Sequence, residues 1–190
     1  MSAFEHVTAL LSFVYALALT HLLARVAELI VARERIKSSG LLALGMVNAV
    51  LLVFVNWLSL WDLRSITSWD LASIAIQFLF AISVYVVCAL VGPKVPDEGV
   101  LDLEDFFWRQ RRYFYGAIIV CLVLALLANL DFLKTANAAL FVKENLGTIV
   151  ILVPSVVGLI SRNYLVQWVA GISLLALMIG FAIVFSSHLG

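Results

Sequence analysis

The chain has 190 residues, of which 64% are hydrophobic and 13% are charged, and its mean hydropathy is +1.11. Soluble domains average about 45–50% apolar and about 25% charged residues, so this composition excludes a soluble protein and indicates an integral membrane protein. Twelve basic and twelve acidic residues balance, which excludes the basic surface that a nucleic-acid-binding protein needs.

The N-terminal residues MSAFEHVTALL have no positive region and no small-residue cleavage site, so they are not expected to be a secretory signal. A helix crosses the hydrocarbon core with about 20 apolar residues. Six stretches qualify, which predicts an all-α polytopic membrane protein forming one domain over residues 1–190. The predicted spans are Val7–Val31, Leu41–Trp61, Leu71–Val91, Tyr113–Leu133, Leu146–Ile160 and Leu165–Phe185.

The fifth predicted span is short and contains Pro154. Proline removes a backbone donor from a helix and clashes with the preceding turn. A kinked or tilted helix is therefore expected at this point.

Basic residues in the loops predict the orientation. Three basic residues, Arg64, Lys134 and Lys143, fall in the even loops, and eight fall in the odd loops. The odd loops are therefore predicted to be cytoplasmic, with both termini on the extracytoplasmic side of a bacterial inner membrane. The eight are Arg33, Arg35, Lys37, Lys94, Arg109, Arg111, Arg112 and Arg162.

The segment LDLEDFFWRQRRYFYG is the one long polar stretch between spans. Acidic residues at its start and basic residues near its end suit the dipole of a helix, and aromatic residues favour the membrane interface. We expect a short cytoplasmic interfacial helix at about 101–112 that then turns into the fourth span. It is interpreted as a surface anchor, or alternatively as a docking site for a partner through Trp108, Arg109, Arg111 and Arg112.

The two halves of the chain differ in polarity. Residues 113–185 carry few polar groups and offer small residues for close helix contact, which is typical of helix packing and lipid contact. Residues 7–91 instead carry one polar stripe on each of three helices. The stripes contain His21, Arg25 and Glu28 on the first helix, Asn48 and Asn56 on the second, and Gln77 and Tyr85 on the third.

Polar groups inside a membrane normally face one another or water. If the first three helices pack together, their stripes would form a polar column with His21 near the midplane. Arg25 and Glu28 are three residues apart and could instead form a simple ion pair, with Arg25 reaching the headgroups. His21 is too short to reach either interface, so it is interpreted as a proton relay, an ion-path residue or a ligand, or as a neutral structural histidine.

Metal and cofactor sites have little support in the sequence. His6 and His188 are predicted at the same membrane face and could share a metal or a haem iron, but interfacial histidines are usually only solvated. Haem ligands in helical bundles usually lie within facing helices. Cys88 and Cys121 are isolated in the sequence and are expected to be buried and inert. No metal or cofactor is predicted.

No catalytic motif occurs in the chain. Amides and a phenol suit hydrated passage better than covalent chemistry. The leading hypothesis is therefore a small homo-oligomeric channel or transporter-like protein, not an enzyme, with a proton or small-ion path through the first three helices. One alternative is a non-transporting accessory or assembly subunit of a larger membrane complex. Another is a redox protein that binds haem or quinone.

Overall fold

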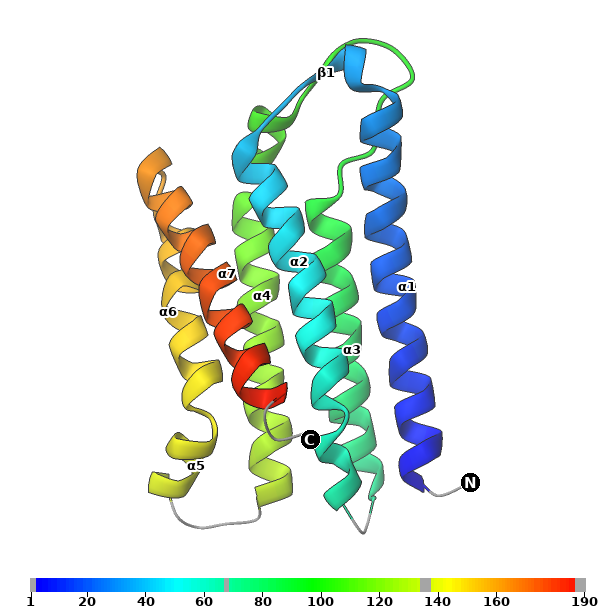
Figure 1. Ribbon diagram of the computed structural model, residues 1–190, viewed down its shortest axis with the longest axis vertical. Coiled ribbons are helices and arrows are strands. Elements are labelled where there is room, and N and C mark those ends of the chain that lie inside the picture. Colours follow the sequence, from blue (N-terminus) through cyan, green and yellow to red (C-terminus); the bar gives the residue numbers. More distant parts are fainter. Residues whose placement is uncertain (1–2, 67–68, 134–137, 187–190) are drawn as a thin grey trace.

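The computed structural model describes residues 3–66, 69–133 and 138–186 (Figure 1). This part of the chain contains seven α-helices, two short 3-10 helices and two strands of two residues each. The α-helices are α1 (Ala3–Val31), α2 (Gly40–Ser59), α3 (Leu71–Val91), α4 (Leu103–Leu133), α5 (Ala138–Glu144), α6 (Leu146–Ile160) and α7 (Tyr164–Ser186). The shorter elements are η1 (Arg33–Arg35), β1 (Ile36–Lys37), η2 (Asp62–Ser65) and β2 (Leu101–Asp102).

The helices have the length and composition of membrane spans. Among the described residues, five helices are long and apolar enough to cross a membrane, and α5 with α6 makes a sixth if this bent pair is one span. Large apolar side chains such as Phe13 (62% exposed) and Val169 (64% exposed) face outward. An apolar surface of this extent is stable against lipid and not against water. The prediction of an all-α chain with several helices suited to span a membrane is therefore confirmed.

The bundle is built around α2, which contacts α1, α3, α4 and α7. The most extensive helix pairs are α3 with α4, α1 with α3, α4 with α6, and α6 with α7. Neighbours in space are therefore not always neighbours in the chain, since α2 packs against α7 (Figure 1). The buried core is mainly aliphatic and aromatic, with Leu11, Leu22 and Val84 fully enclosed, but it also contains buried polar side chains such as Asn48 and Gln167.

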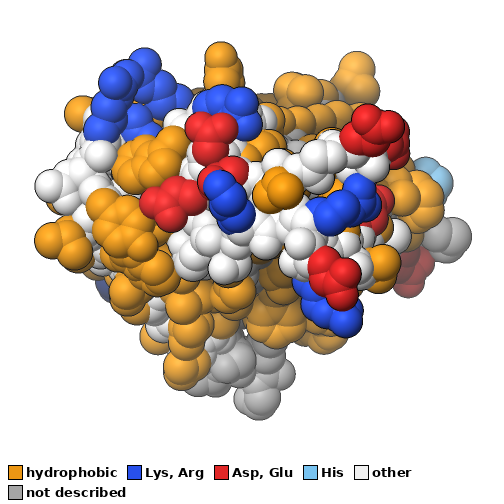
Figure 2. All heavy atoms as spheres, turned by 90° about the horizontal axis from the view of Figure 1, so that it is seen from above, with side chains coloured by type: hydrophobic (Ala, Val, Ile, Leu, Met, Phe, Trp, Pro, Cys, Tyr) orange, Lys and Arg blue, Asp and Glu red, His pale blue; other side chains and the backbone are white. Residues whose placement is uncertain are grey.

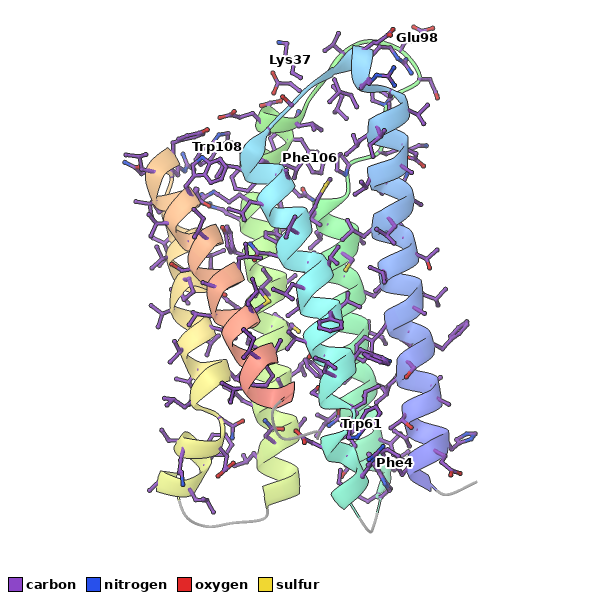
Figure 3. All side chains as sticks on the ribbon, in the orientation of Figure 1. Phe4, Lys37, Trp61, Glu98, Phe106 and Trp108 are labelled. Atoms are coloured by element: carbon purple, nitrogen blue, oxygen red, sulfur yellow. The ribbon has the colours of Figure 1, made fainter. Side chains whose placement is uncertain are left out.

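The charged connections lie at one end of the bundle. η1, β1, β2 and the link from α6 to α7 lie at this end, whereas the start of α1, η2 and α5 lie at the other (Figure 1). β1 pairs in parallel with β2, and Lys37 lies 3.5 Å from the Asp102 carboxylate. Figure 2 shows acidic and basic side chains gathered on this end. Figure 3 places Lys37 and Glu98 here and Phe4 and Trp61 at the opposite end.

The separate interfacial helix expected at about 101–112 is not present, and the prediction is corrected. These residues form the beginning of α4, which continues without a break to Leu133. Asp102 caps the helix, because its Oδ1 accepts the N–H groups of Glu104 and Asp105 at 3.0 and 3.1 Å. At about 1.5 Å per residue, the 31 residues of α4 make a helix longer than the thickness of a hydrocarbon core.

The bend in the fifth span lies away from Pro154, which also corrects the prediction. Pro154 is inside α6, whereas α5 and α6 meet at an angle of 69° next to Asn145. The side chain of Asn145 is almost fully buried and bonds to other backbone and side-chain groups at the break. A polar side chain that competes with the helical hydrogen bonds therefore accompanies this break.

Candidate functional site: a polar cavity beside a broken helix

A cavity of about 480 Å³ lies inside the end of the bundle that contains α5. Its walls come from α2, α3, α4, α6 and α7, with single residues from α1 and α5 and two from η2. Most of the lining is apolar, but one side-chain amide or hydroxyl comes from nearly every wall. These polar groups belong to Tyr15, Asn56, Ser59, Gln77, Asn129 and Thr148.

Two polar side chains in the lining have unused hydrogen-bonding capacity. Gln77 is only 6% exposed, and its amide makes no hydrogen bond to any residue in the described part of the chain. Tyr15 is 2% exposed, and its hydroxyl likewise has no hydrogen bond within residues 3–66, 69–133 and 138–186. The amide of Gln77 and the hydroxyl of Tyr15 are open to the cavity and not enclosed by protein. Both groups are therefore available to bind water or a ligand in the cavity.

Asn56 contributes a third polar group, and its orientation is fixed. Its Nδ2 donates to the carbonyl of Leu52 at 2.7 Å, one turn earlier in α2. The hydroxyl of Ser59 donates to the carbonyl of Asn56 at 2.8 Å. The amide oxygen of Asn56 thus remains as an acceptor beside Gln77 in the same cavity.

The cavity is closed toward the charged end of the bundle and reaches the opposite end. Leu52, Phe80, Cys121 and Leu122 form its deep wall, and each is buried. Near η2 and α5 the lining includes Asp62 and Glu144, and both of these side chains are exposed. The opening therefore lies at the end of the bundle that holds the start of α1 (Figure 1).

The break between α5 and α6 forms one wall of this cavity. Asn129 in α4 donates from Nδ2 to Oδ1 of Asn145 at 2.6 Å, and Asn145 donates to the carbonyl of Phe141 at 3.0 Å. Thr148, in the first turn of α6, lines the cavity. The N–H groups of that turn have no acceptor within their own helix and carry its positive dipole end.

The other end of α6 is capped by two buried side chains. The guanidinium of Arg111 in α4 donates to the carbonyls of Gly158, Leu159 and Ser161. The amide of Gln167 in α7 donates to Gly158 at 2.9 Å and to Ser161 at 2.7 Å. A cation and an amide thereby satisfy the terminal carbonyls of α6, where the helix dipole is negative. Both ends of α6 are thus fixed by polar contacts.

The polar stripe of α1 lies away from the cavity. His21 is half-buried, and its ring centroid lies 5.7 Å from that of Tyr85 in α3. Arg25 donates to Glu28 at 2.8 Å, so the ion pair expected from their spacing is present. A Cβ at Gly92 would contact the aliphatic stem of Arg25, which therefore lies against the end of α3.

The predicted column is divided into separate groups. Asn48 faces α7, where its Nδ2 donates to the carbonyl of Gly171 at 3.0 Å, and its Oδ1 has no partner among the described residues. Asn56 and Gln77 do meet, at the cavity. Within the part of the chain that is described, no side-chain hydrogen bond connects His21 or Asn48 with this cavity pair.

The four residues considered for partner docking have different environments. Arg109 is exposed and pairs with Asp105 at 2.9 Å, and Arg112 is also exposed. Trp108 is half-buried, and the Cζ atom of Arg111 lies 5.8 Å from the centroid of the Trp108 ring. Arg111 is 2% exposed and caps α6, so its guanidinium is part of the bundle and cannot serve as a docking group.

The histidines do not converge on one site. His6 and His21 lie fifteen positions apart on α1, which is about 22 Å along the helix and too far for one metal. His188 lies outside the described residues. Within the described ranges, no group of three His, Cys, Asp or Glu side chains could hold a metal ion.

Several residues of the site are absent from the sequence prediction. Tyr15 and Asn129 lie in largely apolar stretches of α1 and α4, whereas Asn145 follows Lys143 and Glu144, and Gln167 follows the polar link at 161–163. The available signal for Tyr15 and Asn129 was their isolation, because a lone polar group in a membrane span needs a partner. Comparison with protein-family models, curated proteins and solved structures finds no match to this chain.

Proposed function

We propose that this protein is a small membrane transport protein and that the polar cavity is its substrate site. The basic odd loops favour a cytoplasmic location for the charged end, and with this orientation the cavity opens to the extracytoplasmic side of a bacterial inner membrane. The observation that carries the proposal is Gln77, a largely buried amide that makes no hydrogen bond within the described residues and lines a cavity closed toward the charged end of the bundle. An amide held in this way is suited to bind a polar group.

The broken span gives the cavity a wall that could move. Discontinuous helices form substrate sites in many transporters because their exposed backbone ends bind polar groups and their breaks act as hinges. Here the first turn of α6 lines the cavity next to the break at Asn145. A change in the angle between α5 and α6 would alter the opening while the Arg111 cap keeps the cytoplasmic end of α6 in place.

This proposal modifies the channel hypothesis. The path no longer runs through His21 and Asn48, because these residues face α3 and α7 away from the cavity. A homo-oligomer is also not required for the site, since all of its described walls come from one chain. The solute reaches the cytoplasm only if the deep wall opens, which is alternating access and not an open pore.

Cysteine labelling tests the proposal. Gln77→Cys is introduced after Cys88→Ala and Cys121→Ala, and the protein is reconstituted into liposomes of known orientation. A membrane-impermeant maleimide is then applied to each side in turn. We expect Gln77→Cys to react from both sides, because the site is exposed alternately, and Ser59→Cys near the opening to react from the extracytoplasmic side.

The matched control is Phe78→Cys, which lies next to Gln77 but is exposed on the outside of the bundle. It should react from neither side, because a lipid-facing thiol does not meet the aqueous reagent. Reaction of Gln77→Cys from only one side, or from neither, would contradict a transport cycle. A protein with a one-sided cavity would then fit the alternative of an accessory subunit without transport of its own.

A further inference from the structure

A second hollow, of about 600 Å³, lies on the outside of the bundle between α1, α2 and α7. Its walls are apolar except for the side chains of Ser12 and Tyr15. Phe54 and Trp57 form one side of this groove, and their rings stack with centroids 6.5 Å apart. Since the groove is on the lipid-facing surface, its natural contents are hydrocarbon.

Tyr15 belongs to the walls of both the groove and the polar cavity. On α2, Leu52 lines the cavity and the next residue, Val53, lines the groove. On α7, Met178 lines the cavity and Ile179 lines the groove. The two spaces are therefore separated by a single layer of side chains. The Tyr15 ring is the part of this layer that carries an unpaired hydroxyl within the described structure.

The groove has the length of one lipid leaflet. It follows α2 from Val47 to Trp57, which is about 15 Å at 1.5 Å per residue, or about half of a 30 Å hydrocarbon core. Trp57 lies toward the end of α2 where the cavity opens, where tryptophan favours the interface. A single alkyl chain in that leaflet matches the groove in length and polarity.

The cavity selects the other part of the ligand. Among the described lining residues there is no Lys, Arg or His, and Asp62 and Glu144 lie near the opening. This charge distribution disfavours an anionic group. Tyr15 and Gln77 offer a hydroxyl and an amide, which can each donate and accept hydrogen bonds. An uncharged hydrogen-bonding group is therefore the best complement to the deep part of the cavity.

We propose that the groove and the cavity together bind one single-chain membrane amphiphile, with its alkyl chain in the groove and its uncharged head group beside Tyr15 and Gln77. The ligand enters sideways from the leaflet when the Tyr15 side chain swings away from the dividing layer. This inference rests on the proposed function, because it names the class of substrate that the same cavity takes.

Photo-crosslinking with defined probes tests this assignment. The purified full-length protein in lipid nanodiscs is exposed to a monopalmitoylglycerol with a diazirine in its chain, and crosslinked peptides are identified by mass spectrometry. Probes with the same chain but a carboxylate head group, or with no head group, are compared. We expect saturable crosslinking to α1, α2 and α7 by the glycerol probe, and weak, non-saturable crosslinking by the other two.

Two substitutions act on the two parts of the site separately. Gln77→Leu removes the amide and should weaken binding of the glycerol probe by about fivefold, since one hydrogen bond is lost. Ala16→Trp fills the groove, which Ala16 lines, and should abolish saturable crosslinking. The matched controls are Gln110→Leu in α4 and Ala24→Trp on an exposed face of α1 away from the groove, which should leave binding unchanged.

Equal crosslinking by the probe without a head group would overturn the inference, because the groove would then be an ordinary lipid-facing surface. Unchanged binding in both Gln77→Leu and Ala16→Trp would overturn it as well. If the glycerol probe fails to bind while Gln77→Cys is still labelled from both sides, transport stands and the substrate is of another class. If it binds while labelling is one-sided, the amphiphile site stands and transport is contradicted.

Discussion

Asn129 and Asn145 join α4 to the break between α5 and α6 through a hydrogen bond of 2.6 Å from Nδ2 to Oδ1. The bond lies beside the polar cavity, whose lining includes Asn129. Because Asn145 also donates to the carbonyl of Phe141, its side-chain amide contacts both α5 and α4. The geometry of the cavity opening therefore depends on this pair.

Removing the Asn129–Asn145 bond should destabilise the bundle. Asn145→Ala loses two hydrogen bonds and should lower the free energy of unfolding by about 2 kcal/mol, and Asn129→Ala by about 1 kcal/mol. The double variant should lose less than the sum, with a coupling of about 0.6 kcal/mol, which is typical between membrane helices. Reversible unfolding in bicelles measures all three, and strict additivity would contradict a direct bond.

Arg111 should be far more important for stability than its neighbours. Arg111→Ala leaves the carbonyl of Leu159 without this donor and removes one of two donors from the carbonyls of Gly158 and Ser161, so it should cost about 3 kcal/mol. Arg111→Lys should recover only part of this loss, because an ammonium does not span the carbonyls as a guanidinium does. Arg112→Ala is the matched control and should change stability by less than about 0.5 kcal/mol. Similar losses at both positions would contradict the cap.

Two glycine-to-alanine substitutions should have opposite effects. A Cβ at Gly158 would overlap the ring of Tyr115, so Gly158→Ala should separate α4 from α6 and cost about 2 kcal/mol. At Gly180 no atom lies within 4 Å of the added Cβ, so Gly180→Ala should stabilise α7 by about 0.5–1 kcal/mol. Thermal unfolding of both variants in the same detergent checks the signs. A stabilised Gly158→Ala would show that α4 and α6 do not pack closely.

The Asp102 cap predicts a dependence of stability on pH. The N–H groups of Asp105 and Glu104, with Lys37, lower the pKa of this carboxyl below its ordinary value of 3.8. Stabilisation from a lowered pKa is present above 3.8 and is lost as the pH falls through the pKa of the folded protein. Asp102→Asn should therefore remove part of the loss of stability below pH 3.8. An unchanged acid profile would contradict the cap.

The sequence was sufficient to predict which segments form helices long and apolar enough to cross a membrane. Apolar runs of the right length identify spans because backbone N–H and C=O groups in lipid must be hydrogen-bonded within the protein. An α-helix satisfies these groups within one segment. The prediction of a separate interfacial helix was wrong. No glycine or proline interrupts residues 103–115, so these residues form the first part of α4 and not a helix of their own. The sequence prediction also failed at the bend, because the buried side chain of Asn145 rather than Pro154 marks the break.

The candidate site was only partly predictable. A polar stripe shows that a residue avoids lipid, but it does not show which helix it faces. Asn56 and Gln77 were correctly grouped because α2 and α3 are neighbours. Asn48 was grouped with them although it faces α7, which lies beside α2 in space and not in sequence. The role of an isolated residue such as Tyr15 depends on which helices pack against it, and the composition of the sequence does not predict that arrangement.

Hydration of residue 77 tests the central claim most directly. A nitroxide is attached at Gln77→Cys or Phe78→Cys in the protein without its natural cysteines, and contact with deuterated water is measured by electron spin-echo modulation. The two positions lie at nearly the same depth in α3, but Gln77 lines the cavity and Phe78 is exposed on the outer surface. The account predicts strong water contact at 77 and little at 78. Equal dryness at both, or more water at 78, would contradict a polar cavity inside the bundle.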